Sequence, residues 1–214
     1  MLDFIVKILL AYMLGSLLGS LIIGRLKGGV DIRSQGSGNA GGTNALRTQG
    51  WKFAAGVMLI DIGKGWLAVV MLPLLSLPAF STDVIDLNWL RIGCGMAVVF
   101  GHVYPLWFGF RGGKGAATLA GVVLGLAPAA LPYVMAVWLL ALMLTGFVGL
   151  STMLSTASFN IWVWLNPNDA REALWLFGIS MTVFVIYTHR GNIQRMYAGN
   201  EHRARKLWLF KGRT

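Results

Sequence analysis

The sequence predicts an all-α integral membrane protein with about seven transmembrane helices, forming a single polytopic domain over residues 1–214. Two observations support this fold class. Only 12% of the 214 residues are charged and 56% are hydrophobic, whereas soluble domains carry about 25% charged residues. The apolar residues also form long runs, as in 53–75, without the alternation that is typical of membrane barrels. A water-facing globule and a β-barrel are therefore both disfavoured.

Each helical crossing of a membrane needs about 20 mainly apolar residues. Seven segments approach this length: 2–23, 53–75, 89–107, 115–127, 130–147, 150–165 and 172–188. The fourth is short and is followed by Pro128 and Pro132, so the sequence leaves open whether it crosses fully. The first has no convincing cleavage site before Arg25, and we interpret it as an anchor rather than a removed signal peptide.

Lysine and arginine gather on one side of the predicted membrane. In membrane proteins, short loops rich in these residues lie on the cytoplasmic side. The loops after the first and third spans and the C-terminal tail hold 14 of the 18 basic residues. The opposite side holds mainly acids, with Lys7, Arg91 and Arg171 as its bases. We therefore expect the N-terminus outside and residues 189–214 to be a basic cytoplasmic tail. The net charge of +10 then reflects topology and anionic lipid headgroups, without a nucleic-acid partner.

The loop after the first span is rich in glycine, amide and hydroxyl groups. Its residues 36–41 spell G-x-G-x-x-G, but a dinucleotide-binding fingerprint needs a strand before it and a crossover helix after it. Neither fits between two membrane helices, so dinucleotide binding is not supported. Glycines also let backbone N–H groups converge on an anion, and Arg47 adds a forked cation. A flexible polar linker is the alternative, although it requires fewer such residues. We predict a phosphate-binding nest that includes Ser37, Gly38, Asn39, Gly41, Thr43, Asn44 and Arg47.

The loop after the third span carries glycines around Lys114. A Walker loop would need glycine at Phe108 and serine or threonine at Gly115, so nucleotide hydrolysis is not supported. At a helix start, however, N–H groups and an ammonium group favour an anion. His102 lies near the same end, and a structural role for it is as well supported as a catalytic one. The candidate site residues of this loop are His102, Gly112, Gly113, Lys114, Gly115 and Thr118.

Two further sets of polar residues stand out. His189, Asn192 and Arg195 recur every three residues after the last span, so a helical continuation would present them on one face; a basic juxtamembrane helix is the alternative. Asp61 and Lys64 lie three apart in the second span and are expected to neutralise each other. Such intramembrane pairs are functional candidates, and a purely structural pair is an equal alternative.

The cysteine count argues against redox chemistry and against a cysteine-ligated metal. The single cysteine, Cys94, excludes an internal disulfide or an iron–sulfur cluster. We expect neither a metal nor a cofactor.

Taken together, three motifs resemble the acyl-phosphate-dependent glycerol-3-phosphate acyltransferases of bacteria, the PlsY family. In chain order they are G-S-G-N-x-G-x-T-N-x-x-R, G-H-x-x-P-x-x-x-x-F-x-G-G-K-G-x-A-T and H-R-x-N-I-x-R. The resemblance extends to D-x-x-K-G at 61–65 and to Gly199 with Glu201. Ala116, Met196 and Gly149 depart from the family's usual residues, and Gly149 stands where a serine hydroxyl is common.

The resemblance implies transfer of a fatty acyl group from acyl phosphate to the 1-hydroxyl of sn-glycerol 3-phosphate, giving lysophosphatidic acid and phosphate for phospholipid synthesis. It implies a multi-pass protein of the bacterial inner membrane, surrounded by lipid, with its active site facing the cytoplasm. Ser37, Arg47, Lys114 and Asn192 would contact glycerol phosphate, and the nest at 36–44 would hold acyl phosphate. The base stays open between His102, His189 and the phosphate itself. A monomer is expected, although no sequence feature fixes the oligomeric state.

The donor can be argued from the histidines. Acyltransferases that use thioesters carry an aspartate five positions after a histidine, but Trp107, Gln194 and Leu207 stand at those positions here. Acyl phosphate is therefore favoured over an acyl thioester.

The alternative from another class is a membrane transporter of a phosphorylated solute, suggested by glycine-broken helices and the buried charge pair. A transporter would need matching polar groups on both sides. The predicted outer loops at 76–88 and 166–171 carry no glycine-rich or basic cluster.

Overall fold

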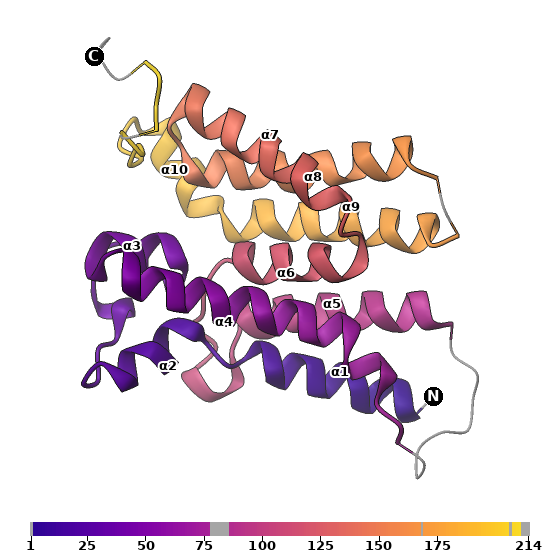
Figure 1. The fold of residues 1–214 in the computed structure, drawn as a ribbon. Coiled ribbons are helices and arrows are strands. Elements are labelled where there is room, and N and C mark those ends of the chain that lie inside the picture. Colours follow the sequence, from indigo (N-terminus) through magenta and orange to yellow (C-terminus); the bar gives the residue numbers. More distant parts are fainter. Residues whose placement is uncertain (1, 78–85, 168, 206, 211–214) are drawn as a thin grey trace. The chain divides into compact units, whose positions relative to one another are not determined.

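The computed structural model describes residues 2–77, 86–167, 169–205 and 207–210, and all regular secondary structure in these residues is helical (Figure 1). The chain forms two compact units, Met1–Pro128 and Ala129–Thr214. The first unit contains α1 (Leu2–Gly15), α2 (Gly19–Leu26), α3 (Gly42–Gln49), α4 (Trp51–Val70), α5 (Leu87–Val103) and α6 (Ala116–Leu126), with short 3-10 helices at Ile32–Ser34, Leu72–Leu74 and Leu106–Phe108. The second contains α7 (Ala130–Thr145), α8 (Val148–Leu165), α9 (Arg171–Thr188) and α10 (Arg190–Tyr197). The all-α prediction is thus confirmed for the described residues.

Helix α4 is central to the first unit, where it packs against α2, α3, α5 and α6 (Figure 1). The α4–α6 contact is close because Gly65 lies against the backbone of Thr118 and Gly121 lies against the backbone of Ile62. A Cβ at either glycine would overlap those atoms. Small residues of this kind let membrane helices approach closely, since lipid tails provide no hydrophobic drive for helix pairing.

The prediction of one continuous first span is wrong. The helix ends at Gly15 and restarts at Gly19, with a bend of 46° between α1 and α2. Such a break leaves backbone groups of two helix ends without helical partners, and side chains of α4 bind them. Lys64 Nζ donates to the carbonyl oxygens of Gly15 and Leu17 at 2.9 and 2.7 Å, and Asp61 Oδ1 accepts from Gly19 N at 3.2 Å. Charges on a neighbouring helix therefore stabilise the break.

The helices α4 to α9 begin and end within a few residues of the other predicted segments. Among the described residues, α4 with its 3-10 extension is alone long and apolar enough to cross a membrane, and the bent pairs α1–α2 and α9–α10 raise the number of candidate crossings to three. Helices α6 and α7 are apolar but shorter. The predicted seven crossings and the outside N-terminus stay predictions.

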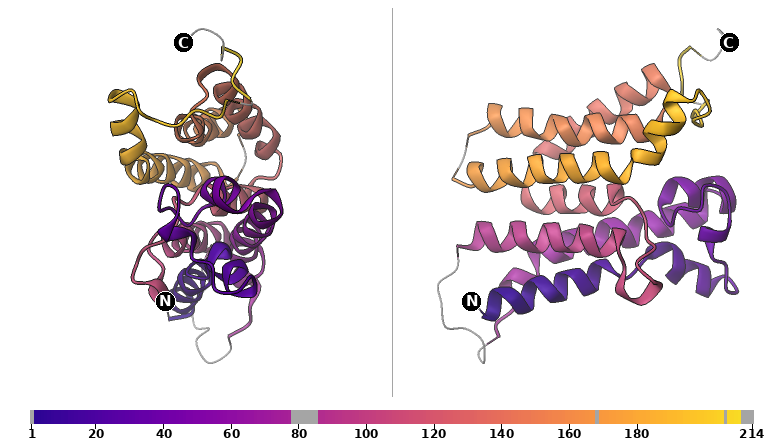
Figure 2. Two further views of the ribbon diagram at one scale, coloured as in Figure 1. Left: turned by 90° about the vertical axis from the view of Figure 1, so that its left-hand side faces the viewer. Right: turned by 180° about the vertical axis from the view of Figure 1, so that it is seen from behind.

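In the second unit, α8 packs against α7 and α9, and α10 contacts α8 and α9 (Figure 2). Helices α9 and α10 meet at His189 with a bend of 55°. The helical continuation predicted after the last span therefore exists, but it leaves the axis of that span.

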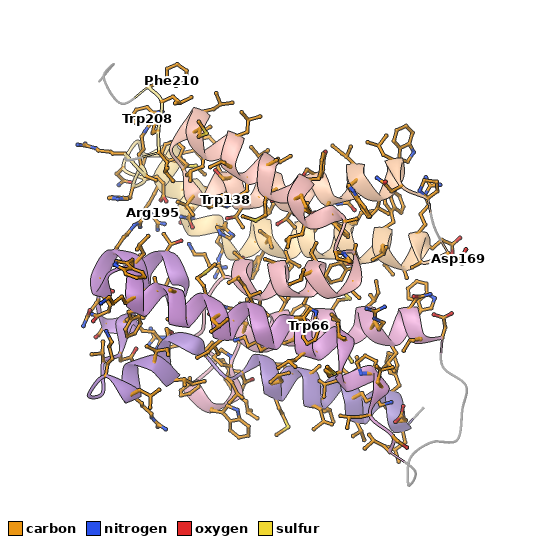
Figure 3. All side chains as sticks on the ribbon, in the orientation of Figure 1. Trp66, Trp138, Asp169, Arg195, Trp208 and Phe210 are labelled. Atoms are coloured by element: carbon orange, nitrogen blue, oxygen red, sulfur yellow. The ribbon has the colours of Figure 1, made fainter. Side chains whose placement is uncertain are left out.

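The segment after α10 returns to the turn between α7 and α8. Ala204 N donates to Gly146 O at 2.8 Å, and Leu209 N donates to Met143 O at 3.0 Å. Trp208 is buried, and Figure 3 shows it at the same end of the unit as Arg195. The predicted basic tail is thus docked on its own unit at these points. Four residues used in the charge argument lie outside the described residues: Asp83, Lys206, Lys211 and Arg213.

Candidate functional site

The predicted first loop is partly helical. The 3-10 helix Ile32–Ser34 precedes its glycines, and α3 begins at Gly42. Three of the predicted phosphate-binding residues therefore lie on a helix rather than in a flexible loop: Thr43, Asn44 and Arg47.

Asn44 connects the turns of this loop through its side chain, which is buried. Its Nδ2 donates to the carbonyl oxygens of Ile32, Gln35 and Asn39 at 2.9, 3.0 and 3.0 Å. Its Oδ1 accepts from Ser37 N at 2.9 Å. The polar atoms of Asn44 are thus used to hold the loop in shape.

The backbone N–H groups of the loop are used in the same way. Gly41 N donates to Asn39 Oδ1 at 2.9 Å, and Gly38 N donates to Gln35 O at 3.0 Å. Ser37 N, as described above, is also used within the loop. The expectation that backbone N–H groups converge on an anion is therefore wrong for these three residues. The glycines instead allow tight turns, and Gly38 has a φ of 71°, which is costly for other residues.

Arg33 joins this loop to the loop that carries Lys114. Its Nε and Nη2 bind the two carboxylate oxygens of Asp31 at 3.1 and 2.8 Å. Its Nη1 donates to the carbonyl oxygens of Phe108 and Arg111, each at 3.1 Å. The Arg33 hydrogen bonds hold the pKa of the Asp31 carboxyl below its usual value, as expected for a bidentate pair. Arg33 thus fixes the two glycine-rich loops relative to each other.

The glycines before Lys114 pack against the end of α5. Gly112 N donates to Val103 O and Gly113 N donates to His102 O, each at 3.1 Å. A Cβ at Gly113 would overlap His102 Nε2. The prediction that these two N–H groups await an anion is therefore wrong, because both are used in backbone hydrogen bonds that set the path of the loop.

Lys114 lies two residues before the first residue of α6, close to a helix start as predicted. Gly115 caps that helix with a φ of 87°, a left-handed conformation that favours glycine. Thr118 is buried in the first turn of α6, and its hydroxyl has no hydrogen-bond partner among the described residues. An anion at Lys114 would therefore lie next to a helix N-terminus.

Asp61, Lys64 and His102 are buried together beside the break in the first helix. Lys64 Nζ lies 2.9 Å from Asp61 Oδ1 and 3.0 Å from His102 Nδ1, and His102 Nδ1 lies 3.5 Å from Asp61 Oδ1. The prediction that Asp61 and Lys64 neutralise each other is confirmed, and His102 joins them.

In the second unit, Glu201 organises two of the predicted site residues. Its Oε1 accepts from Asn192 Nδ2 at 2.7 Å, and its Oε2 accepts from Arg195 Nε at 2.6 Å. Gly149 lies against the Asn192 side chain, where a Cβ would be 3.0 Å from Asn192 Cγ. Serine in place of Gly149 would therefore crowd the amide.

His189 is also buried in the second unit. Its Nδ1 lies 2.8 Å from Val185 O and 3.3 Å from Thr188 Oγ1. Because a carbonyl oxygen can only accept, we assign the ring proton to Nδ1, which makes Nε2 the basic nitrogen.

Comparison with known proteins decides the family. The sequence model described as glycerol-3-phosphate acyltransferase matches residues 5–199. The chain belongs to the glycerol-3-phosphate acyltransferase family, PlsY. The family's enzyme from Chlorobaculum parvum is 38% identical over 230 residues, which cover 95% of this chain and 97% of that protein. The enzyme from Azotobacter vinelandii is 40% identical over 194 residues, which cover 90% and 95%.

Solved structures agree with this assignment. The crystal structure of PlsY (YgiH), described as an integral membrane glycerol 3-phosphate acyltransferase in its glycerol 3-phosphate form, matches with a TM-score of 0.79 and 34% identity over 94% of each chain. Its lysophosphatidic acid form matches equally well. This protein is therefore an acyltransferase with the integral membrane PlsY fold.

Sequence reasoning missed the residues that position the PlsY motifs in this chain. In the sequence, Arg33 is one of the basic residues of the first loop, and Asp31 belongs to none of the motifs. Glu201 was recognised in the motif without a role. An aspartate two residues before an arginine is a weak signal for the first pair, whereas the contact of Arg33 with residues 75 and 78 positions away has no local signal.

Among the described residues, no three histidine, cysteine, aspartate or glutamate side chains gather as a metal site would require.

Proposed function

We propose that this glycerol-3-phosphate acyltransferase takes its acyl group from acyl phosphate and transfers it to the 1-hydroxyl of sn-glycerol 3-phosphate. The products are lysophosphatidic acid and inorganic phosphate. One observation carries the proposal: a match to the family over residues 5–199 that contains all three motifs of the acyl-phosphate-dependent enzymes in order. The crystal forms of PlsY with glycerol 3-phosphate and lysophosphatidic acid support the acceptor and the product.

Two cations of the first unit are assigned to phosphate groups. Arg47 lies in the last turn of α3, and Lys114 lies two residues before α6. Arg33 joins the loop that leads into α3 to the loop that carries Lys114. We assign Ser37, Arg47, Lys114 and Asn192 to glycerol phosphate. Acyl phosphate is assigned to the loop at 36–44, where side-chain donors of Asn39 and Thr43 are the candidates because several N–H groups serve the loop itself. Of the remaining predicted residues, Thr118 lies in the first turn of α6 and Arg195 binds Glu201 in the second unit. The others shape the two glycine-rich loops: Gly38, Gly41, Asn44, Gly112, Gly113 and Gly115.

The chemistry requires little from the protein beyond positioning and charge neutralisation. Acyl phosphate is a mixed anhydride with a good leaving group, so the substrate hydroxyl attacks the acyl carbon directly. The new ester C–O bond forms, the acyl C–O bond to phosphate breaks, and phosphate leaves with the electron pair. Cations that neutralise the developing charge and hold the hydroxyl near the carbonyl supply the catalysis.

His189 is the better of the two histidine candidates for the base. Its Nδ1 is held by Val185 O, so the basic nitrogen is Nε2. His102 instead uses Nδ1 to accept from Lys64. The alternative base is the phosphate of a substrate. A His189→Gln variant distinguishes His189 from the substrate phosphate as the base. If the phosphate is the base, the pH dependence of the reaction is unchanged in that variant.

The sequence-based topology supports a multi-pass protein of the bacterial inner membrane with its site facing the cytoplasm. Glycerol 3-phosphate would enter from the cytoplasm and the acyl chain from the bilayer. We propose that the monomer is active.

Donor use tests the proposal. Purified protein in lipid nanodiscs is given radiolabelled glycerol 3-phosphate with acyl phosphate, acyl-coenzyme A or acyl-carrier protein at equal concentration. We expect lysophosphatidic acid only with acyl phosphate, with release of one phosphate per product. Equal rates with a thioester would overturn the donor assignment, while no product from any donor would overturn the function. The Arg47→Ala protein in matched nanodiscs controls for non-enzymatic acylation.

A further inference from the structure

The break in the first helix creates an electrostatic problem inside the membrane. The last carbonyl groups of α1 carry the negative end of a helix dipole, and the first N–H groups of α2 carry the positive end. Without water, each unsatisfied backbone group costs several kcal/mol, so irregular backbone at membrane depth persists only where protein groups bind it. In this protein Lys64 binds the carbonyl end and Asp61 binds the N–H end. The charge pair matches the dipoles at both ends.

His102 extends this cluster to the loop that carries Lys114. The ring accepts at Nδ1 from Lys64 Nζ, 3.0 Å away, because an ammonium group can only donate. The ring is therefore neutral and carries its proton on Nε2. That side of the ring faces Gly113, where a Cβ would overlap Nε2. Gly113 N also donates to the His102 carbonyl oxygen at 3.1 Å. The position of the ring thus sets the position of the residue just before Lys114.

We propose that Asp61, Lys64 and His102 form an intramembrane brace that holds the broken first helix and, through His102 and Gly113, fixes the Lys114 loop for binding glycerol 3-phosphate. His102 is then a positioning residue and not the base. The inference rests on the proposed role of Lys114. It explains why three ionisable groups, 0%, 3% and 2% exposed, are buried where no step of the reaction uses them.

The first test compares two replacements of His102. Glutamine can accept from Lys64 through its oxygen and donate through its nitrogen, whereas leucine can do neither. We expect His102→Leu to raise the KM for glycerol 3-phosphate by up to about a hundredfold, as small misplacements of a binding group do. The KM for acyl phosphate should stay near wild type. His102→Gln should recover much of the lost affinity and keep the wild-type pH profile of kcat. Loss of kcat in both variants with an unchanged KM would identify His102 as the base and overturn the brace.

The second test probes the contact with Gly113, whose φ lies outside the left-handed region. Gly113→Ala adds a Cβ that overlaps the His102 ring, so it should raise the KM for glycerol 3-phosphate. In a His102→Ala background the ring is absent, and the same added methyl should raise KM much less. If Gly113→Ala instead raises KM by the same factor in both backgrounds, Gly113 and His102 do not act through each other. Gly63→Ala is the matched control, because a Cβ there meets nothing within 4 Å.

The third test addresses the charge pair. Asp61→Asn or Lys64→Met alone leaves a buried unpaired charge and should greatly reduce the yield of folded protein. The double variant is neutral and should fold better than either single variant, while still raising the KM for glycerol 3-phosphate because the break has lost its partners. Wild-type KM in the folded double variant would overturn the brace. If the double variant does not fold, the Gly113 and His102 cycle decides. Wild-type turnover in the same assay distinguishes failure of the brace from failure of the proposed function.

Discussion

At the residue scale, the polar groups of the first loop are divided between shaping and binding. The side chain of Asn44 and three backbone N–H groups bind within the loop. The shape of the loop is therefore held by its own hydrogen bonds. The side chains assigned to phosphate, those of Ser37 and Arg47, gain affinity from this preorganisation.

Loss of either proposed phosphate-binding cation should reduce turnover without unfolding the protein. A charge-assisted hydrogen bond is worth about 1.5 to 3 kcal/mol, so Arg47→Ala or Lys114→Ala should lower kcat/KM roughly ten- to a hundredfold or somewhat more. Arg47→Lys should also lose activity if the guanidinium fork is used. Steady-state kinetics with thermal unfolding in detergent would measure both effects. Lys52→Ala is the control, since Lys52 is an exposed cation in the same part of the chain. Near-normal kinetics in all three variants would limit these cations to a topological role.

Replacement of Asn44 by aspartate should be more damaging than its size suggests. Aspartate puts a carboxylate oxygen where the Asn44 amide donates to three carbonyl oxygens. Unsatisfied buried acceptors of this kind cost about 1 to 3 kcal/mol each. We expect a clear drop in the midpoint of thermal unfolding, together with increased proteolysis at the loop. Asn200→Asp, an exposed substitution of the same kind, should have little effect. Equal stability of the two variants would contradict the role of Asn44 in shaping the loop.

Sequence reasoning identified the residues of this loop but not the atoms that they use. Glycine, asparagine and threonine at 38–44 indicated a polar turn, and the structure contains one. Whether an asparagine faces a ligand or three backbone carbonyls depends on how the turn closes, and the glycine-rich pattern gave no sign of helix α3. The same applies to Gly112 and Gly113, where the requirement for glycine comes from the α5 backbone and the His102 ring rather than from an anion.

At the element scale, the clamp made by Arg33 couples the two loops that carry the proposed phosphate-binding cations. A single guanidinium binds one acid in its own loop and two carbonyl groups in the other loop. Lysine cannot reproduce that fork. Movement of either loop should therefore affect the other.

Arg33→Lys should loosen both loops while keeping the charge. With about 1 kcal/mol for a typical lost hydrogen bond, we expect roughly a fivefold increase in the KM for glycerol 3-phosphate. Arg25→Lys, at an exposed position in α2, is the matched control. An unchanged KM in both variants would show that the clamp does not position the site.

The same clamp predicts a pH effect on stability. Because the folded-state pKa of Asp31 is lowered by Arg33, the pair stabilises the fold fully above the usual aspartate range and loses this contribution as pH falls through the lowered value. Asp31→Asn should therefore destabilise the protein at pH 7 and much less in strong acid. Thermal unfolding of both proteins from neutral pH downwards would measure this. A difference that grows as pH falls would contradict the assignment.

The limits of the helices were predictable to within a few residues wherever apolar runs ended at polar loops. The break after Gly15 was not, because residues 2–23 have no proline and no charge between Lys7 and the loop. The local signal was a set of small residues, Gly15, Ser16, Gly19 and Ser20, and its meaning depended on Asp61 and Lys64 in another helix.

At the scale of the whole molecule, two bases on the predicted outer side have structural partners. Lys7 Nζ binds Asp3 and donates to Pro73 O, and Arg91 donates to Val69 O and Gly125 O at the ends of two helices. These charges have local roles. The charge asymmetry of the remaining loops is therefore a stronger indicator of orientation than the raw count.

The predicted topology can be tested by labelling. In a Cys94→Ala background, single cysteines at the exposed positions Ser37, Arg111 and Arg195 should react with a membrane-impermeant maleimide only after the inner membrane is opened. Asp169→Cys should react in intact spheroplasts, and Figure 3 shows Asp169 at the opposite end of its unit from Arg195. Reaction of the Ser37 and Arg111 positions from different sides would rule out a shared cytoplasmic site.

The break between α1 and α2 also implies an order of events during membrane insertion. The carbonyl group of Gly15 is bound by a lysine 49 residues later in the chain, which at about 5–20 residues per second is synthesised roughly 2 to 10 seconds afterwards. Until that lysine arrives, a broken helix has no partner for its backbone in the bilayer. We expect the first segment to enter the membrane as a straight helix and to bend only when α4 inserts beside it. The nascent first span is thus a temporary structure, and the bent form is a product of assembly.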